Sequence, residues 1–398
     1  MGVYQELGVA PIINASGTLT RLGGSRMAPA VLAAMAEAAS SFVRIDELQE
    51  RAGEVIAEVT GAEAGYVVTG AAAGLALGVA ACVAGLDVAK MDRLPDTAGM
   101  QNEVVVQRGH RNAYDHAIRM VGVHFVEVGY LGYPGAGGTF DWQLDEVITE
   151  HTAAVACPVL DTPGTLPLPV VAEIAHAKGV PVVVDAAASL PPRANLRRFI
   201  AEGADLVCFS GGKAIGGPQA SGVLAGRRDL IASVALQHQD MDVRAATWSQ
   251  RARIADGTLR GVPQQGFGRA MKVGREEIVG LIVALRHFAA GNDDADRARW
   301  HAILDIVQAE LGDRPHVSIC RLAGTNRILP MLTLELDEPA LGLTAYDALN
   351  QLLDGRPPIA VAETRAEFGV ITVNPHGLTE DEATIVGCRL RETLTTTR

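Results

Sequence analysis

A single lysine follows a buried, apolar segment of the sequence through a short glycine turn. The run Val207–Ser210 is apolar up to its last residue, and Gly211, Gly212 and Lys213 follow it directly. Glycine lets the backbone turn sharply and approach a ligand closely. Burial at a strand end lowers the pKa of an amine, which favours the neutral nucleophile that Schiff-base chemistry requires. The alternative is a surface lysine in a glycine-rich loop.

A carboxylate closes a second apolar run. Val182, Val183 and Val184 favour a buried strand that ends at Asp185. An aspartate is rarely buried without a partner. A pyridinium N–H is a suitable partner, because the ion pair keeps the ring protonated and able to accept electrons from a carbanion. In isolation, a metal ligand or a helix cap would explain the same residue.

The spacing of these two side chains makes the pair more specific than either part. One helical segment separates Asp185 from Lys213. A strand–helix–strand unit of this size places both residues at the same edge of adjacent strands. One side chain then reaches the nitrogen of a pyridine ring and the other reaches its aldehyde carbon. The pair predicts pyridoxal 5′-phosphate (PLP) as cofactor, with Lys213 and Asp185 as catalytic, cofactor-binding residues and no metal.

A turn between a predicted strand and a predicted helix is suited to the phosphate. The free N–H groups at a helix start, together with the positive end of its dipole, favour an anion. The hydroxyl groups of Thr69 and Ser210 would add donors. The alternative is a tight strand-to-helix turn without a ligand. We expect the phosphate to be bound by Thr69, Gly70, Ala71, Ala72 and Ser210.

A histidine follows a third predicted strand, Glu103–Gln107. An imidazole at the end of that strand would stack on the cofactor ring, so His110 is a further catalytic and cofactor-binding candidate. Tyr114 is the rival for this role. A helix-capping or surface histidine is the alternative interpretation.

Alternating strands and helices must position these residues. This alternation predicts an α/β fold with a mainly parallel sheet, helices on both faces, and ligands at the carboxyl ends of the strands. Asp87–Asn102 is expected to be a long polar loop. The predicted strands are Ala64–Val68, Glu103–Gln107, His124–Val128, Thr152–Leu160, Val180–Asp185, Leu206–Ser210 and Ser221–Ala225. The predicted helices are Pro29–Ser41, Asp46–Thr60, Ala71–Leu86, Asn112–Val121, Val170–Lys178, Leu196–Glu202 and Glu276–Ala290.

The pattern changes in the last third of the chain. We expect an N-terminal arm over residues 1–27, a large PLP-binding domain over 28–270 and a small C-terminal α+β domain over 271–398. Strands are predicted near Met331–Leu336 and Gly369–Val373 in the small domain.

Composition and charge argue against several classes of protein. The net charge is −12 and the pI is about 5.3, so the chain repels polyphosphate backbones, and no nucleic-acid partner is expected. The five cysteines stand singly, without a CxxC pair. The N-terminus lacks a secretory pattern, and the apolar stretch Ala71–Leu86 is too short to span a bilayer. We expect a cytoplasmic protein without membrane contact.

The order of motifs along nearly the whole chain resembles the SelA-like family of fold-type-I, aspartate-aminotransferase-like PLP enzymes. This family includes L-seryl-tRNA(Sec) selenium transferase and D-glucosaminate-6-phosphate ammonia-lyase. The motifs are ASGTLTRLGG (15–24), TGAAAG (69–74), RGHRN (108–112), VDAA (184–187), SGGK (210–213), GGPQ (216–219) and GRAMKVG (268–274).

The resemblance implies the roles given above for Lys213 and Asp185, and a seven-stranded sheet. It also implies a homodimer or larger oligomer with active sites at the subunit interface. In such an assembly the segment Gln264–Lys272 would reach the phosphate held by the partner subunit, with Arg269 and Lys272 as candidates.

Two activities of the family compete. A selenium transferase holds a tRNA, and the bacterial members carry an extra N-terminal domain for this. We expect no such domain here, because catalytic-domain sequence begins by about residue 12. We therefore expect a lyase for a small amino acid or amino sugar acid, in which α-proton abstraction and β-elimination give a 2-keto acid and ammonia. Racemase, aldolase and aminotransferase reactions share the first steps and stay open. The candidates for binding substrate anions are Arg21, Arg26, Arg44, Arg111 and Arg365.

Overall fold

The computed structural model describes residues 2–131, 138–160, 162–238, 242–322 and 328–395. The packing divides the chain into two compact units, which are residues 27–289 and residues 1–26 together with 290–398. The domain boundaries expected at 27/28 and 270/271 stay a prediction. Among the described residues, no helix is both long and apolar enough to cross a membrane.

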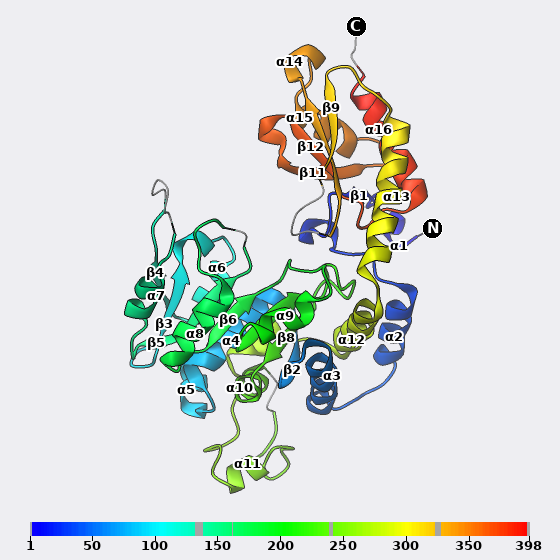
Figure 1. The fold of residues 1–398 in the computed structure, drawn as a ribbon. Helices are drawn as coiled ribbons and strands as arrows, with labels where there is room; N and C mark the ends of the chain where they lie inside the picture. Colours follow the sequence, from blue (N-terminus) through cyan, green and yellow to red (C-terminus); the bar gives the residue numbers. More distant parts are fainter. Residues whose placement is uncertain (1, 132–137, 161, 239–241, 323–327, 396–398) are drawn as a thin grey trace. The chain divides into compact units, whose positions relative to one another are not determined.

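The larger unit is built on a seven-stranded sheet (Figure 1). β8 is antiparallel to β2 and β7, and the other neighbouring pairs are parallel. This arrangement confirms the predicted α/β fold with a mainly parallel sheet. The strand order is β2 (Ala64–Val68), β8 (Gly222–Gly226), β7 (Leu206–Ser210), β6 (Val182–Asp185), β5 (Thr152–Pro158), β3 (Glu103–Gln107) and β4 (His124–Val128).

The central strands are apolar because both faces of the sheet are covered. Successive side chains point to opposite faces, so Val183 packs in one core while Val182 and Val184 pack in the other. Helices contributing to the first core are α4 (Ala71–Ala84), α5 (Val88–Arg93), α6 (Asp115–Arg119) and α10 (Arg228–His238). Those contributing to the second are α2 (Pro29–Ala39), α3 (Ile45–Thr60), α7 (Asp141–Val147), α8 (Leu168–Ala177), α9 (Asn195–Ala201) and α12 (Arg275–Ala290).

The smaller unit has its own sheet and core. Its edge strand β1 comes from the N-terminal segment and pairs in parallel with β11, whereas the other pairs are antiparallel. The strand order is β1 (Ile13–Ala15), β11 (Ile359–Arg365), β12 (Val370–Val373), β10 (Met331–Leu336) and β9 (Val317–Leu322). The long helices are α13 (Asp293–Leu311), α15 (Ala345–Leu353) and α16 (Glu380–Thr393).

Two expectations about helices in the larger unit were wrong. The segment expected to be a polar loop contains α5, which begins because the Asp87 carboxylate accepts hydrogen bonds from the amides of Ala89 and Lys90. The helix expected from Asn112 begins only at Asp115, because the Asn112 side chain accepts from the amide of Tyr114 and forms a turn instead.

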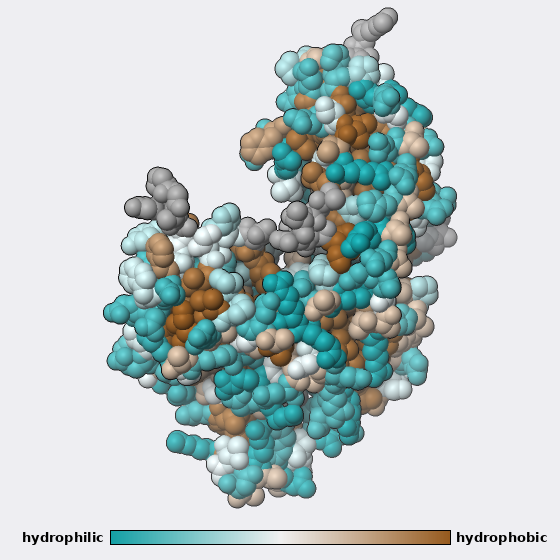
Figure 2. All heavy atoms as spheres, viewed as in Figure 1, coloured by the Kyte–Doolittle hydropathy of each residue, from teal (hydrophilic) through white to brown (hydrophobic). Residues whose placement is uncertain are grey.

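The surface seen in Figure 2 is mainly hydrophilic, with an apolar patch in the region where Figure 1 labels α8. The connection from α2 to α3 also exposes apolar side chains. Phe42 is 98% exposed, and Val43 and Ile45 are exposed beside it. Isolated apolar residues on a surface are ordinary, but a cluster of this kind indicates a contact face.

Candidate active site

The two strands that carry the predicted catalytic pair are neighbours in the sheet. Asp185 is the last residue of β6, where it lies opposite Pro158 of β5 and Cys208 of β7. β7 ends at Ser210, and Lys213 lies in the turn that follows. Both residues therefore lie at the carboxyl edge of the parallel strands, which is the edge where such sheets bind ligands.

The turn that carries Lys213 folds back onto the start of β8. The Gly211 amide donates to the Ser221 carbonyl over 2.9 Å, and the Gly217 amide donates to the Gly211 carbonyl over 2.8 Å. A Cβ at position 212 would lie 2.7 Å from the Cα of Gln219. Only glycine fits there without a backbone shift, so the turn fixes where the lysine leaves the chain.

Burial acts in opposite directions on the two charged groups. It raises the pKa of the Asp185 carboxyl above its usual value, although the Ala187 amide, 3.0 Å away, and the Lys213 charge oppose the shift. Burial also lowers the pKa of the Lys213 amine, against the charge of Asp185. The two side chains therefore feel each other's charge, and each lies in a site that disfavours its ionised form. Perturbed pairs of this kind mark functional sites.

A glycine cradle lies beside this pair. Gly222 begins β8 between Val68 of β2 and Ser210 of β7. A Cβ on it would lie 2.7 Å from the carbonyl carbon of Gly70. Gly70 itself has a φ of 141° and caps α4 without a side-chain hydrogen bond. The amides at the start of α4 therefore face a space that no capping side chain fills, which suits a phosphate.

The Thr69 hydroxyl, which was expected to add a donor for the phosphate, has a hydrogen-bond partner in this structure. Thr69 Oγ1 donates to the carbonyl of Met271 over 3.1 Å. A hydroxyl has one proton, so the hydroxyl cannot donate to a phosphate while this bond exists. Binding of the phosphate by Thr69, Gly70, Ala71, Ala72 and Ser210 stays a prediction.

A single 3₁₀ turn, η2 (Arg108–His110), directly follows β3, and His110 is its last residue. Its side chain is buried, with 3% exposure, and its Nδ1 has no hydrogen-bond partner among the described residues. Burial lowers its pKa, which favours a neutral ring. A buried ring nitrogen without a partner is costly, and a ligand at the site would remove that cost. Tyr114, the rival, is 67% exposed.

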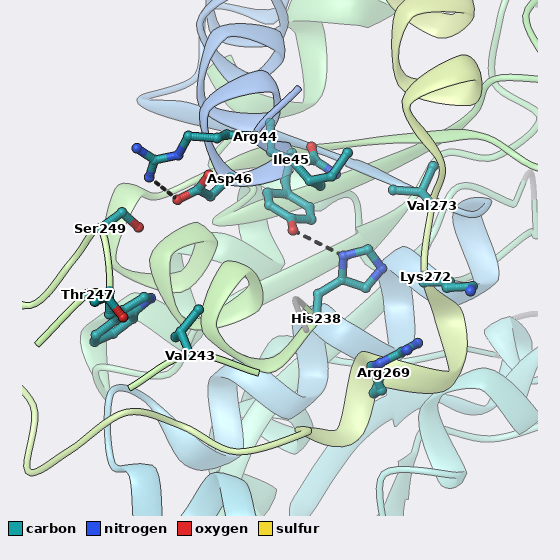
Figure 3. A pocket seen from close by; sticks show the side chains of 13 residues that line it. Arg44, Ile45, Asp46, His238, Val243, Thr247, Ser249, Arg269, Lys272 and Val273 are labelled. Atoms are coloured by element: carbon teal, nitrogen blue, oxygen red, sulfur yellow. Dashed lines mark hydrogen bonds and ion pairs between the residues drawn. The ribbon is translucent and has the colours of Figure 1, made fainter. Parts of the chain in front are cut away.

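Arg269 and Lys272 lie in and directly after the 3₁₀ helix η3 (Phe267–Met271). They line a cavity of about 470 Å³ (Figure 3). Tyr66 and His238 line the same cavity. The bond from Thr69 to Met271 places this segment beside the phosphate loop of its own chain. The predicted reach toward a partner subunit stays a prediction.

Four of the five candidate arginines are engaged by carboxylates. Arg111 forms ion pairs with Asp115 and Glu127, and Arg44 pairs with Asp46 over 2.9 Å. The pairs in the smaller unit are Arg21–Glu363 at 2.9 Å and Arg26–Glu382 at 2.7 Å. An arginine paired in this way binds a substrate anion only if it exchanges or shares its partner.

Tyr66 and His238 were not predicted from the sequence. Tyr66 stands inside an apolar strand, where an aromatic residue is expected in any case. His238 ends α10, a helix that the sequence analysis did not identify. The only available signal was a histidine in the last turn of an unrecognised helix, which is a common and unspecific position.

The residues at the edge of the sheet fit pyridoxal phosphate by charge and by shape. A carboxylate lies at one strand end, an amine follows the next strand, and the close contact of Gly222 with the start of α4 lies beside them. The orphaned nitrogen of His110 adds a buried polar atom without a partner in the described structure.

A model of the L-seryl-tRNA selenium transferase family, SelA, matches residues 166–245. D-Glucosaminate-6-phosphate ammonia lyase of Salmonella typhimurium is 34% identical over 98% of this chain and 97% of its own. The 5′-C-glycyluridine monooxygenase-decarboxylase of a Streptomyces species is also 34% identical, over 98% of this chain and 92% of its own.

A solved structure of D-glucosaminate-6-phosphate ammonia-lyase superposes with a TM-score of 0.80 and 33% identity. The match covers 99% of this chain and 98% of the other. Similarity of sequence and of structure therefore extends over nearly the whole protein. The chain belongs to the SelA-like family of fold-type-I, PLP-dependent enzymes.

Proposed function

We propose that this enzyme is an ammonia-lyase that converts an amino sugar acid into a 2-keto acid. The observation that carries the proposal is the charge-coupled pair of Asp185 and Lys213 at one edge of the sheet. The near full-length similarity to D-glucosaminate-6-phosphate ammonia lyase supports the choice of reaction. PLP, when bound, supplies an electron sink for a carbanion at the α-carbon of the substrate.

Each side chain at this edge of the sheet would have a separate role. Asp185 would keep the nitrogen of the cofactor ring protonated, because its largely buried carboxylate needs a cationic partner. Lys213 would hold the cofactor through Nζ. Once the substrate amine has displaced it, the free Lys213 amine, whose pKa is lowered by burial, would take the α-proton. His110 would cover the ring, and the amides of Gly70–Ala72 and the Ser210 hydroxyl would bind the phosphate.

Elimination fits this set of groups. Removal of the α-proton places charge next to the β-carbon, from which a hydroxide leaves with a proton from a neighbouring acid. Hydrolysis of the resulting enamine releases ammonia and the 2-keto acid. Lys213, protonated by the first step, is the group able to return that proton to the leaving oxygen.

A second candidate function rests on another relative with the same sequence identity to this chain. The relative described as a monooxygenase-decarboxylase is as similar in sequence as the ammonia lyase, so oxygen-dependent decarboxylation of an amino acid joined to a sugar is the rival. The match to the selenium transferase model keeps seryl-tRNA as a further candidate substrate. These reactions differ in their products and co-substrates.

One experiment separates the lyase from the oxygen-dependent decarboxylase. Full-length protein with PLP is incubated with D-glucosaminate 6-phosphate, unphosphorylated amino sugar acids, serine and threonine, while ammonia, 2-keto acid, carbon dioxide and oxygen are measured. Equal amounts of ammonia and 2-keto acid without oxygen uptake support the proposal. Oxygen uptake with release of carbon dioxide, or racemised substrate without ammonia, contradicts it. Lys213→Ala serves as the inactive control.

We also infer that two copies of the chain associate. Phe42, Val43 and Ile45 are exposed, and Ile45 lines the cavity that Arg44 and Lys272 also line. Exposed apolar groups of this kind are typical of subunit contacts. Light scattering should give at least twice the chain mass of 41.7 kDa. A monomer at micromolar concentration would rule out this inference.

The cytoplasm is the proposed location. The free cysteines Cys82, Cys157, Cys208, Cys320 and Cys388 are consistent with a reducing compartment. Fractionation of expressing cells should recover the protein with cytoplasmic markers, and recovery with membrane or secreted fractions would contradict this.

A further inference from the structure

Two buried polar side chains outside the catalytic pair are joined in a chain of hydrogen bonds. The Tyr66 hydroxyl lies 3.0 Å from Nδ1 of His238, as the dashed line to His238 in Figure 3 marks. Nε2 of the same ring lies 2.8 Å from the carbonyl oxygen of Met271. Tyr66 and His238 are both buried, so these bonds are made away from bulk water.

The direction of each bond follows from the chemistry of the atoms. A carbonyl oxygen only accepts, so Nε2 of His238 carries a proton and donates. Burial lowers the pKa of His238 and favours the neutral ring, in which Nδ1 accepts from the Tyr66 hydroxyl. The chain therefore runs from Tyr66 through His238 to Met271.

The Met271 carbonyl is where this chain meets the phosphate loop. A carbonyl oxygen has two lone pairs, and here His238 Nε2 and Thr69 Oγ1 both donate to it. Thr69 directly precedes Gly70 and the first amides of α4. His238 holds the Met271 oxygen in place, and this oxygen in turn holds the side chain of Thr69 at the start of the phosphate-binding turn.

Glycines allow η3 to lie close enough to α10 for these bonds. A Cβ on Gly268 would lie 2.9 Å from the Cα of His238 and 2.5 Å from a methyl carbon of Leu77. A Cβ on Gly266 would lie 2.8 Å from the carbonyl oxygen of Gln237. The close approach is a fixed feature of the packing, because backbone atoms of α10 form most of the contact.

We propose that Tyr66 and His238 are positioning residues for the cofactor phosphate, acting through the Met271 carbonyl on Thr69 and the amides that follow it. This inference rests on the PLP function proposed above. Neither side chain needs to touch the cofactor. Their task is to hold the amides at the start of α4 in the geometry that a phosphate requires, so that binding does not have to order the turn.

The test compares three variants with a matched control. His238→Leu removes both hydrogen bonds, Tyr66→Phe removes one hydroxyl and preserves the packing, and His238→Gln retains a donor at nearly the place of Nε2. The control is Ser233→Ala. Ser233, on the same helix, donates to the carbonyl of Gly85 at the other end of α4.

The measurements are made on cofactor-free, full-length protein. PLP is titrated into each variant to obtain its dissociation constant from visible absorbance, and thermal unfolding is followed without PLP. We expect the dissociation constant to rise about tenfold in His238→Leu, about threefold in Tyr66→Phe and about twofold in His238→Gln. Ser233→Ala should lower the unfolding temperature and leave the dissociation constant unchanged.

The outcomes separate this inference from the function on which it rests. If the wild-type protein binds no PLP, the proposed function fails. If the wild type binds PLP and Tyr66→Phe binds it with the wild-type constant, the positioning role is wrong. An equal loss of affinity in Ser233→Ala would also overturn it, because a general loosening of α4 would then explain the effect. Tyr66→Phe keeps the test decisive even if His238→Leu does not fold.

Discussion

Two groups of polar atoms in the larger unit differ in how their surroundings treat them. At the edge of the sheet, burial disfavours the charged forms of Asp185 and Lys213, and the Nδ1 of His110 has no hydrogen-bond partner among the described residues. Around η3, the polar atoms of Tyr66, His238 and Met271 are paired with one another.

Such a difference is expected between groups that react and groups that fix geometry. A group that binds a ligand or transfers a proton often lies where its charged form is disfavoured, and this placement costs folding free energy. Groups that only fix geometry gain from complete pairing, because a satisfied buried network is rigid. Substitutions of the catalytic candidates at the edge of the sheet should therefore mainly lower turnover. Substitutions around η3 should mainly weaken the binding of the cofactor.

The largest effect is expected at the lysine. Lys213→Ala removes the amine that holds the cofactor and takes the α-proton, so turnover should fall by a factor on the order of 10⁴ or more. The bound cofactor should also lose the visible absorbance that it shows in the wild type. Turnover within about tenfold of the wild type, from a homogeneous sample, would mean that another base does the work.

At Asp185, activity and stability should move in opposite directions. Asp185→Asn retains the shape but loses the charge that keeps the cofactor ring protonated, so turnover should fall by roughly 10²–10³-fold. The cofactor-free protein should gain stability at neutral pH, by on the order of 2 °C in unfolding temperature, because a buried carboxylate is no longer ionised.

The sign of the pH dependence follows from the raised pKa. A carboxyl whose pKa is higher in the folded state binds more protons there than in the unfolded chain, so its contribution to stability falls as the pH rises above its usual value near 3.8. The stability gap between Asp185→Asn and the wild type should therefore widen as the pH rises above about 4 and then become constant. If the stability gap narrowed as the pH rises, the pKa of Asp185 would be lowered and not raised in the folded protein.

The smallest of these effects on turnover is expected at the phosphate cradle. In Gly222→Ala, the new methyl group would push against the backbone of Gly70. PLP affinity should fall about tenfold or more, while turnover at saturating cofactor changes only a few-fold. Gly261→Ala is the control, because its added Cβ would meet no atom within 4 Å. Equal affinities in the two variants would contradict the cradle.

The strands of the larger unit could be predicted because their signals are local. Runs such as Glu103–Gln107 and Leu206–Ser210 are uniformly apolar in their interior, and the structure has strands with the same bounds. Short helices were harder to predict. α5 depends on a single capping carboxylate at Asp87, which is equally common in turns.

The catalytic candidates were also recognisable from local sequence. Asp185 and Lys213 each follow an apolar strand, and parallel strands bring such ends together whatever the remaining fold does. The arginine candidates gave no such signal. Pairs such as Arg26 with Glu382 join residues from opposite ends of the chain, and no local pattern identifies them.

The sequence by itself determined the chemistry available at the edge of the sheet, because strand burial and glycine turns are encoded by neighbouring residues. Only the tertiary structure decided how the phosphate loop is held. The bonds that hold it join Tyr66 to His238 and Thr69 to Met271, across 172 and 202 positions of the chain. Hydrogen bonds over such separations depend on how the elements pack, and the bond from the Thr69 hydroxyl to Met271 is one of them.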